Sequence, residues 1–182
     1  MNTLHNINLA MTARLFNSAL AVLILLSCYA TVSFAKSPAR VIAGWAEKVR
    51  VENHPYDIKA KLDTGAKTSS IHAIDIQPFK RDGERWAKFT LILNDSQGEQ
   101  HKITLEKPRS RKASIKNHDG NNDTRYVINL EVCFNGRRFT TEFTLADRSE
   151  YIYDILLGRQ FLKEAAIIDP DKTFLTLASC EA

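Results

Sequence analysis

The 182-residue sequence lacks the residue patterns that mark zinc and nucleotide sites. It holds three cysteines and five histidines, but neither a Cys-x-x-Cys pair nor a His-Glu-x-x-His pair, which are spacings that hold zinc. The glycine-rich loop that cradles nucleotide phosphates and ends in Gly-Lys-Ser/Thr is absent as well. We therefore expect no metal, no ATP and no other cofactor.

Strong charge is also missing. The formal net charge is +4, with a sequence pI near 9.0, which is too mild a balance to predict nucleic-acid binding. Hydrophobic residues make up 44% of the chain and charged residues 25%, as in an ordinary globular protein. These values exclude a disordered or fibrous chain.

Acidic residues are absent from the first 35 positions. This stretch has one basic residue, Arg14, followed by an apolar run from Leu15 to Leu26. The run is shorter than the roughly 20 apolar residues that span a membrane. A basic residue, a short apolar region and small residues before a boundary are typical of a secretory signal.

The small residues Ser33 and Ala35 place the expected cleavage site. We predict a signal peptide over 1–35, a single domain over 36–182, and a periplasmic or secreted product. The alternatives are an uncleaved N-terminal anchor and lipidation at Cys28. The expected product keeps Cys133 and Cys180, which either form one disulfide in an oxidising compartment or remain unpaired.

The rest of the chain has the alternating hydrophobic pattern of short strands, with turns every eight to twelve residues. This pattern predicts a small β-barrel or sandwich with one short helix over Arg159–Ala165. We expect a long polar, basic loop over Lys107–Asp123 and a turn over Asp169–Lys172. The expected strands are Val41–Val51, Tyr56–Leu62, Ser70–Ile76, Trp86–Leu93, Gln100–Leu105, Tyr126–Phe134, Arg138–Leu145, Asp154–Leu157 and Thr173–Leu177.

The most informative motif follows the strand that ends at Leu62. Asp63-Thr64-Gly65 puts a carboxylate, a hydroxyl and a residue without a side chain into one tight turn. Alone, the motif indicates no more than an Asx-type turn. A second segment downstream, Ile155–Leu162, has three apolar residues followed by Gly158-Arg159 and the start of a helix.

Together these segments resemble the retropepsin family of aspartic peptidases. The sequence is more closely similar to a bacterial subgroup that carries the label ATP-dependent zinc protease, over about residues 43 to 170. The resemblance implies a small closed β-barrel of the retropepsin type with one short C-terminal helix. The matching segments are Gly44-Trp45, Lys61–Ser69, Ile71–Ala73, Arg125–Ile128, Thr144–Arg148 and Leu156–Arg159.

The resemblance further implies an exported aspartic-type endopeptidase, a hydrolase that cleaves a peptide or protein substrate. In that chemistry two carboxylates about 3 Å apart share one proton, and together they activate water. The chain has one Asp-Thr-Gly, so a dyad requires Asp63 from both subunits of a homodimer. We expect Asp63, Thr64 and Gly65 to be catalytic, with no nucleic acid and no ATP as partners.

Substrate binding is expected from Ala66, Lys67, Arg109 and Arg111. Lys67 stands where viral retropepsins commonly carry an acidic residue, which favours an anionic group near the site. Arg159 is expected to tie the Gly158 segment to the partner subunit or to the loop before Asp63. Two alternatives remain open: a non-catalytic protein that binds a peptide or envelope ligand on the same fold, and a zinc-dependent protease.

Overall fold

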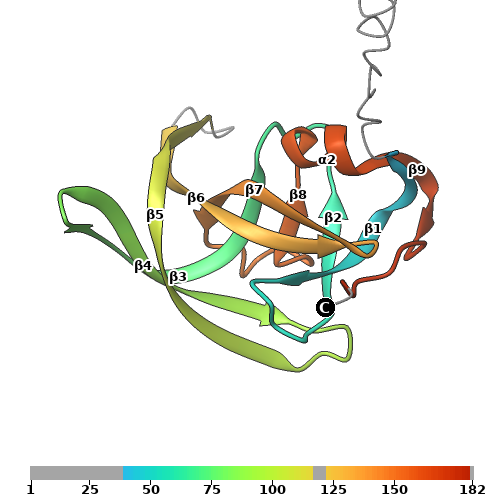
Figure 1. Cartoon of the computed structure of the whole chain (residues 1–182), viewed down its shortest axis with the longest axis horizontal. Coiled ribbons are helices and arrows are strands. Elements are labelled where there is room, and N and C mark those ends of the chain that lie inside the picture. Colours follow the sequence, from blue (N-terminus) through green and yellow to red (C-terminus); the bar gives the residue numbers. More distant parts are fainter. Residues whose placement is uncertain (1–38, 117–121, 181–182) are drawn as a thin grey trace, which may run out of the picture. The chain divides into compact units, whose positions relative to one another are not determined.

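The computed structural model describes residues 39–116 and 122–180 (Figure 1). The expected signal peptide lies outside these residues. The described chain is mainly β with one short helix, which confirms the expected fold class. Its elements are β1 (Val41–Val51), β2 (Ile58–Leu62), β3 (Ser69–Arg81), β4 (Glu84–Asn94), β5 (Gln100–Lys116), β6 (Asn122–Phe134), β7 (Arg137–Ala146), β8 (Ile155–Leu157), α2 (Arg159–Ala165) and β9 (Ala166–Thr173).

The strands form one sheet that closes on itself in two rings. Their order is β4-β5-β6-β7-β3-β8-β2-β1-β9. An additional pairing of β4 with β3 closes one ring, and a pairing of β6 with β1 closes the other. Strands β3, β6 and β7 belong to both rings, and the largest buried side chains include Phe89, Phe134, Phe143 and Phe161. Burial of these phenylalanine side chains on the inner face of the sheet is a main source of stability.

The helix is short. Across residues 39–116 and 122–180, no helix is long and apolar enough to span a membrane. Export of the protein stays a prediction.

The expected loop over Lys107–Asp123 is wrong. β5 continues to Lys116 and β6 begins at Asn122, and the two strands run side by side as an antiparallel pair (Figure 1). Lys112 lies opposite Tyr126 in this pair, with the register shifted between Arg109 and Arg111. Cross-strand hydrogen bonds satisfy the backbone, so the strand persists although few of its side chains are buried.

The expected last strand over Thr173–Leu177 is also wrong. β9 lies earlier and runs through the expected turn at residues 169–172. The turn survives as an irregularity, because the parallel register jumps from Gly44–Asp169 to Ala46–Thr173. A Cβ atom on Gly44 would lie 2.4 Å from the Lys172 carbonyl oxygen, so only glycine admits this close approach.

The chain after β9 is held by a fully buried carboxylate. Glu47 Oε1 accepts hydrogen bonds from the backbone N–H groups of Gly44 (2.6 Å) and Leu175 (2.9 Å). Glu47 Oε2 accepts from the N–H (3.0 Å) and hydroxyl (2.9 Å) of Thr176. A buried charge is tolerated when its oxygens are satisfied in this way.

A disulfide fixes the same segment to β6. Cys133 and Cys180 are bonded, with their Cα atoms 5.6 Å apart, which lies within the usual range for disulfides. This result selects the bonded alternative of the two that the sequence left open. Between the two cysteines, the Asn135 N–H donates to the Leu177 carbonyl at 2.7 Å.

We predict that Glu47→Ala lowers the free energy of unfolding by about 3 kcal/mol, because several buried backbone N–H groups lose their hydrogen-bond acceptor. Urea denaturation of the oxidised protein measures the change. Glu84→Ala, at an exposed position, is the control and is expected to change stability by less than about 0.5 kcal/mol. Equal effects of the two substitutions would contradict the role of Glu47.

Candidate functional site

Asp63 is the first residue after β2, and its backbone is anchored to β8. The Asp63 N–H donates to the Leu157 carbonyl at 2.8 Å, which extends the parallel β2–β8 pair by one residue. Asp63 Oδ1 accepts from the N–H groups of Gly65 (2.8 Å) and Ala66 (3.2 Å). This is the geometry of an Asx turn, in which a side chain stands in for a backbone carbonyl.

The loop after Asp63 is clamped by the chain that enters α2. Arg159 Nη1 donates to the carbonyls of Thr64 (2.9 Å) and Gly65 (2.7 Å), and the Arg159 N–H donates to Ala66 O at 2.9 Å. A Cβ atom on Gly158 would lie 2.8 Å from the Thr68 carbonyl carbon. Arg159 therefore ties the Gly158 segment to the loop after Asp63, rather than to the loop before it.

The Asp63 carboxylate is held in its ionised form. Partial burial raises its pKa, but the Gly65 N–H, the charge of Lys61 and the Ala66 N–H together bring the pKa below the ordinary value of 3.8. Lys61 Nζ lies 3.5 Å from Asp63 Oδ2. In the single chain this environment therefore favours the charged form of the Asp63 carboxylate.

A groove of about 500 Å³ lies beside this loop. Its lining is unusual in charge, because among residues 39–116 and 122–180 it includes five basic side chains and no carboxylate. The basic residues are Lys67, Arg111, Lys112, Arg125 and Arg148. Such a lining creates a positive potential, which attracts anions and discriminates against cations.

Two of the five basic side chains are neutralised by carboxylates outside the lining. Arg111 forms a two-pronged pair with Glu142, at 2.7 Å and 3.0 Å to Oε2, and its Nη2 also donates to Thr68 Oγ1 at 3.2 Å. Arg125 Nε donates to Asp123 at 2.6 Å. The hydrogen bond from Arg111 is the main cause that lowers the pKa of Glu142, with burial opposing it.

The other three basic side chains have no carboxylate partner among the described residues. Within the described parts of the chain, Lys67, Lys112 and Arg148 form no ion pair. The pKa of Arg148 is lowered by burial, with the charges of Tyr151, Asp154 and Asp63 opposing this effect. Arg148 therefore places a nearly buried positive charge near Asp63 as well as in the groove.

The structure brings together most of the residues predicted to bind substrate. Ala66, Lys67 and Arg111 line the groove, whereas Arg109 does not. The Arg109 guanidinium lies 4.6 Å from the centre of the Tyr126 ring, and its Nε is buried without a partner among the described residues. The roles predicted for these four residues and for Asp63, Thr64 and Gly65 stay predictions.

Among the residues that line the groove, sequence reasoning missed Ser70, Arg125 and Arg148. Arg125 and Arg148 lie in segments that matched the resembled family, but nothing in the sequence showed where they point. Ser70 lines the groove as well, and its hydroxyl is buried without a hydrogen-bond partner in the described chain. Ser70 and Arg148 share the burial of a polar group, which depends on tertiary packing, whereas Arg125 is only partly buried.

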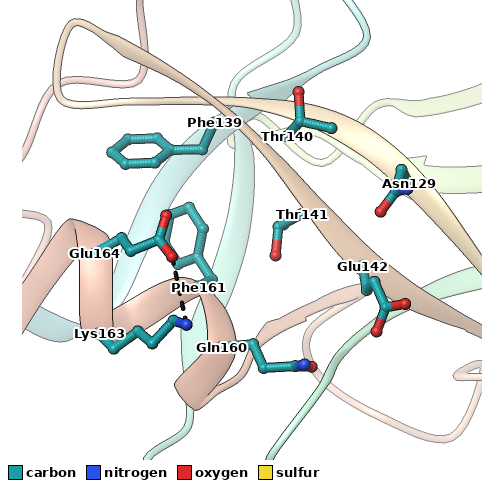
Figure 2. A pocket seen from close by; sticks show the side chains of 9 residues that line it. All are labelled: Asn129, Phe139, Thr140, Thr141, Glu142, Gln160, Phe161, Lys163 and Glu164. Carbon is teal, nitrogen blue, oxygen red and sulfur yellow. Dashed lines mark ion pairs between the residues drawn. The ribbon is translucent and has the colours of Figure 1, made fainter.

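A smaller pocket of about 210 Å³ lies on the other side of Glu142, between β7 and α2. Figure 2 shows Phe139 and Phe161 at one end of this pocket, with Glu142 and Gln160 at the other. Its charged side chains include both signs, and Lys163 pairs with Glu164 at 3.5 Å. This pocket lacks the uncompensated charge of the groove, so the groove is the candidate binding site.

One cluster has the composition of a metal site. The ligand atoms of Asp95, Glu99 and His101 lie within 4.8 Å of one another. Asp95 Oδ1, however, accepts from the N–H groups of Gln97 and Glu99, and Oδ2 lies 2.9 Å from His101 Nε2. These bonds account for the cluster as the turn between β4 and β5.

The closed mainly β fold, together with an Asp-Thr-Gly turn clamped by a Gly-Arg segment, defines a protein of the retropepsin-like class. The chain belongs to the RimB-like family, described as "Retropepsin-like aspartic endopeptidase RimB", whose family model matches residues 42–178. This result confirms the resemblance seen in the sequence.

Curated relatives contradict the expected activity. A protein from Desulfotalea psychrophila is 41% identical over 115 residues, and one from Shewanella pealeana is 40% identical over 121 residues. Both carry the name "Probable alpha-L-glutamate ligase". The matches cover 62% and 64% of this chain but only 24% and 25% of those relatives.

These names belong to ligases, whereas an aspartic-type endopeptidase is a hydrolase. The expectation that this chain is an aspartic-type peptidase with a dyad of Asp63 residues is therefore wrong by this finding, whereas its export stays a prediction. The description of the family and the names of the curated relatives thus differ, because the family description contains the words "aspartic endopeptidase". A homodimer stays a prediction.

A solved structure supports the fold. A protein of unknown function (DUF785) from Legionella pneumophila is 28% identical and has a TM-score of 0.64. The match covers 76% of this chain and 100% of that one.

We predict that Lys61→Met raises the pKa of Asp63, because it removes the nearby positive charge. Carbon-detected NMR titration of the side-chain carboxyl measures the pKa. Lys59→Met, on the same strand but outside the Asp63 hydrogen-bond set, is the control and is expected to leave it unchanged. Equal titration in wild type and Lys61→Met would contradict the assignment.

The same measurement has a stability counterpart. A carboxyl whose pKa is lowered on folding stabilises the protein above its unfolded pKa and loses that contribution as pH falls through the folded value. Lys61→Met is therefore expected to reduce stability near neutral pH and to have little effect once Asp63 is protonated.

Proposed function

We propose that the chain takes part in α-L-glutamate ligation by binding an acidic glutamyl segment in the groove beside Asp63. The observation that carries this proposal is the lining of the groove, which has five basic side chains and, within the described part of the chain, no carboxylate. The choice of an acidic ligand comes from the curated relatives, which are named as ligases of α-L-glutamate. The chain spans about a quarter of their length, so the proposal gives it a part in the ligation.

The rigidity of the groove supports binding. Arg111 is fixed by Glu142 and Thr68, and the backbone at Lys67 follows the loop that Arg159 clamps. A side chain that is already ordered, as that of Arg111 is, loses less conformational entropy when it binds an anion. Lys67 and Lys112 remain exposed, and they are suited to meet the first carboxylates of an extended segment.

Asp63 supplies the opposite charge. Its ionised carboxylate is only partly buried, and it is joined to the groove through the N–H of Ala66. A carboxylate in this position suits the α-ammonium of a glutamyl segment whose carboxylates lie in the groove. The proposal therefore orients the ligand with its free amine toward Asp63.

We predict that hexaglutamate, with α-linked residues, binds the chain and that the neutral analogue hexaglutamine does not. Isothermal titration calorimetry at an ionic strength of about 0.05 M is suitable, because screening is weak there. Lys67→Gln is expected to weaken binding about threefold, as for one solvent-exposed ion pair. Lys163→Gln, outside the groove, is the matched control. Equal binding of the two peptides would refute the proposed function.

A second prediction tests the orientation. Asp63→Asn is expected to weaken binding of hexaglutamate with a free amine, but not of its N-acetylated form. In the wild type, acetylation alone is expected to reproduce the loss. If Asp63→Asn weakens both peptides equally, Asp63 acts through the fold of the loop rather than through the ammonium.

A further inference from the structure

The groove lining includes two buried polar residues whose hydrogen-bonding capacity the described fold does not fully use. Ser70 is 6% exposed, and its buried hydroxyl has no hydrogen-bond partner among residues 39–116 and 122–180. Its neighbour across the β3–β7 pair, Thr144, uses its own hydroxyl to bond Ser69 O at 3.2 Å. A buried hydroxyl without a partner destabilises a fold, so its presence in a groove points to a ligand.

Arg148 is the second group, and it is 7% exposed. Its backbone N–H donates to His72 Nδ1 at 2.9 Å, and its Nε donates to the Tyr153 carbonyl at 3.0 Å. The guanidinium also lies 4.7 Å from the centre of the Tyr151 ring. Within the described chain, Nε is the one side-chain nitrogen of Arg148 that has an acceptor. Its terminal nitrogens therefore keep their donors for a planar anion.

Part of the groove lining is apolar. Ala113, Ile115 and Leu156 line the same groove, and none carries a polar side chain. A ligand that reaches Ser70 and Arg148 from the exposed lysines therefore needs an anionic tip on an apolar stem. The side chain of glutamate has this form, with two methylene groups before the carboxylate, whereas aspartate has one.

We propose that Ser70 and Arg148 form a subsite that selects glutamate side chains over aspartate by length. The glutamate carboxylate accepts hydrogen bonds from the Ser70 hydroxyl and the Arg148 guanidinium, while its methylenes contact Ile115 and Leu156. This inference rests on the proposed function and specifies which acidic residue the groove prefers.

Labelled hexaglutamate and hexaaspartate, measured by fluorescence anisotropy, test the subsite. Wild type is expected to bind hexaglutamate about tenfold more tightly, the lower range for one methylene in an apolar site. Ser70→Ala is expected to remove most of this preference by weakening hexaglutamate alone. Ser114→Ala removes a hydroxyl that lines the same groove at an exposed position, and it is expected to keep the preference.

Stability provides an independent readout. Because the Ser70 hydroxyl has no partner in the free protein, Ser70→Ala is expected to leave the melting temperature unchanged or to raise it. Arg148→Lys keeps the charge but loses the planar fork, and it is expected to reduce the preference for hexaglutamate as well. A melting temperature lowered by Ser70→Ala would show that the hydroxyl is structural and would overturn the subsite.

The outcomes separate this inference from the proposal on which it rests. If both acidic peptides bind equally well and Ser70→Ala changes neither, the subsite is refuted and acidic-peptide binding stands. If neither peptide binds, the proposed function falls and the subsite with it.

Discussion

The contact between the Asp63 loop and the Gly158-Arg159 segment organises the whole candidate site. β8 is only three residues long, yet it pairs with β2 on one side and with β3 on the other. The chain leaving β8 then bonds the carbonyls of Thr64, Gly65 and Ala66. These pairings and hydrogen bonds set the positions of Ser70, Leu156 and Lys67 in the groove. A change at Gly158 therefore affects the groove without any contact between its side chain and a ligand.

Much of the fold could be predicted from hydrophobic period alone. The alternation in Val41–Val51 and the helix over Arg159–Ala165 match the structure at both ends. The errors occur where backbone pairing overrides composition. Lys107–Asp123 is polar enough to predict a loop, but most of it is paired strand, and the segment after Thr173 is held by Glu47 instead of by a neighbouring strand.

The site was predictable in part for the same reason. Asp63 and Lys67 sit in one continuous segment, so local sequence identifies them. Ser70 and Arg148 are separated along the chain, and their importance comes from being buried in one groove. Burial of a hydroxyl or a guanidinium depends on which strands pair, which no local pattern contains. The activity was misjudged because a fold and its loop can be shared by proteins that do different chemistry.

The parallel pairing of β1 with β9 has a consequence for synthesis on the ribosome. The first described strand cannot complete its edge until the last one has been made, because Val41 lies beside Ala166. The second carboxylate oxygen of Glu47 likewise has no hydrogen bond from Thr176 until that residue has been synthesised. Contacts of this sequence separation form slowly and late. The growing chain thus carries an unsatisfied acidic residue and an open strand edge through most of translation, when chaperone contact matters most.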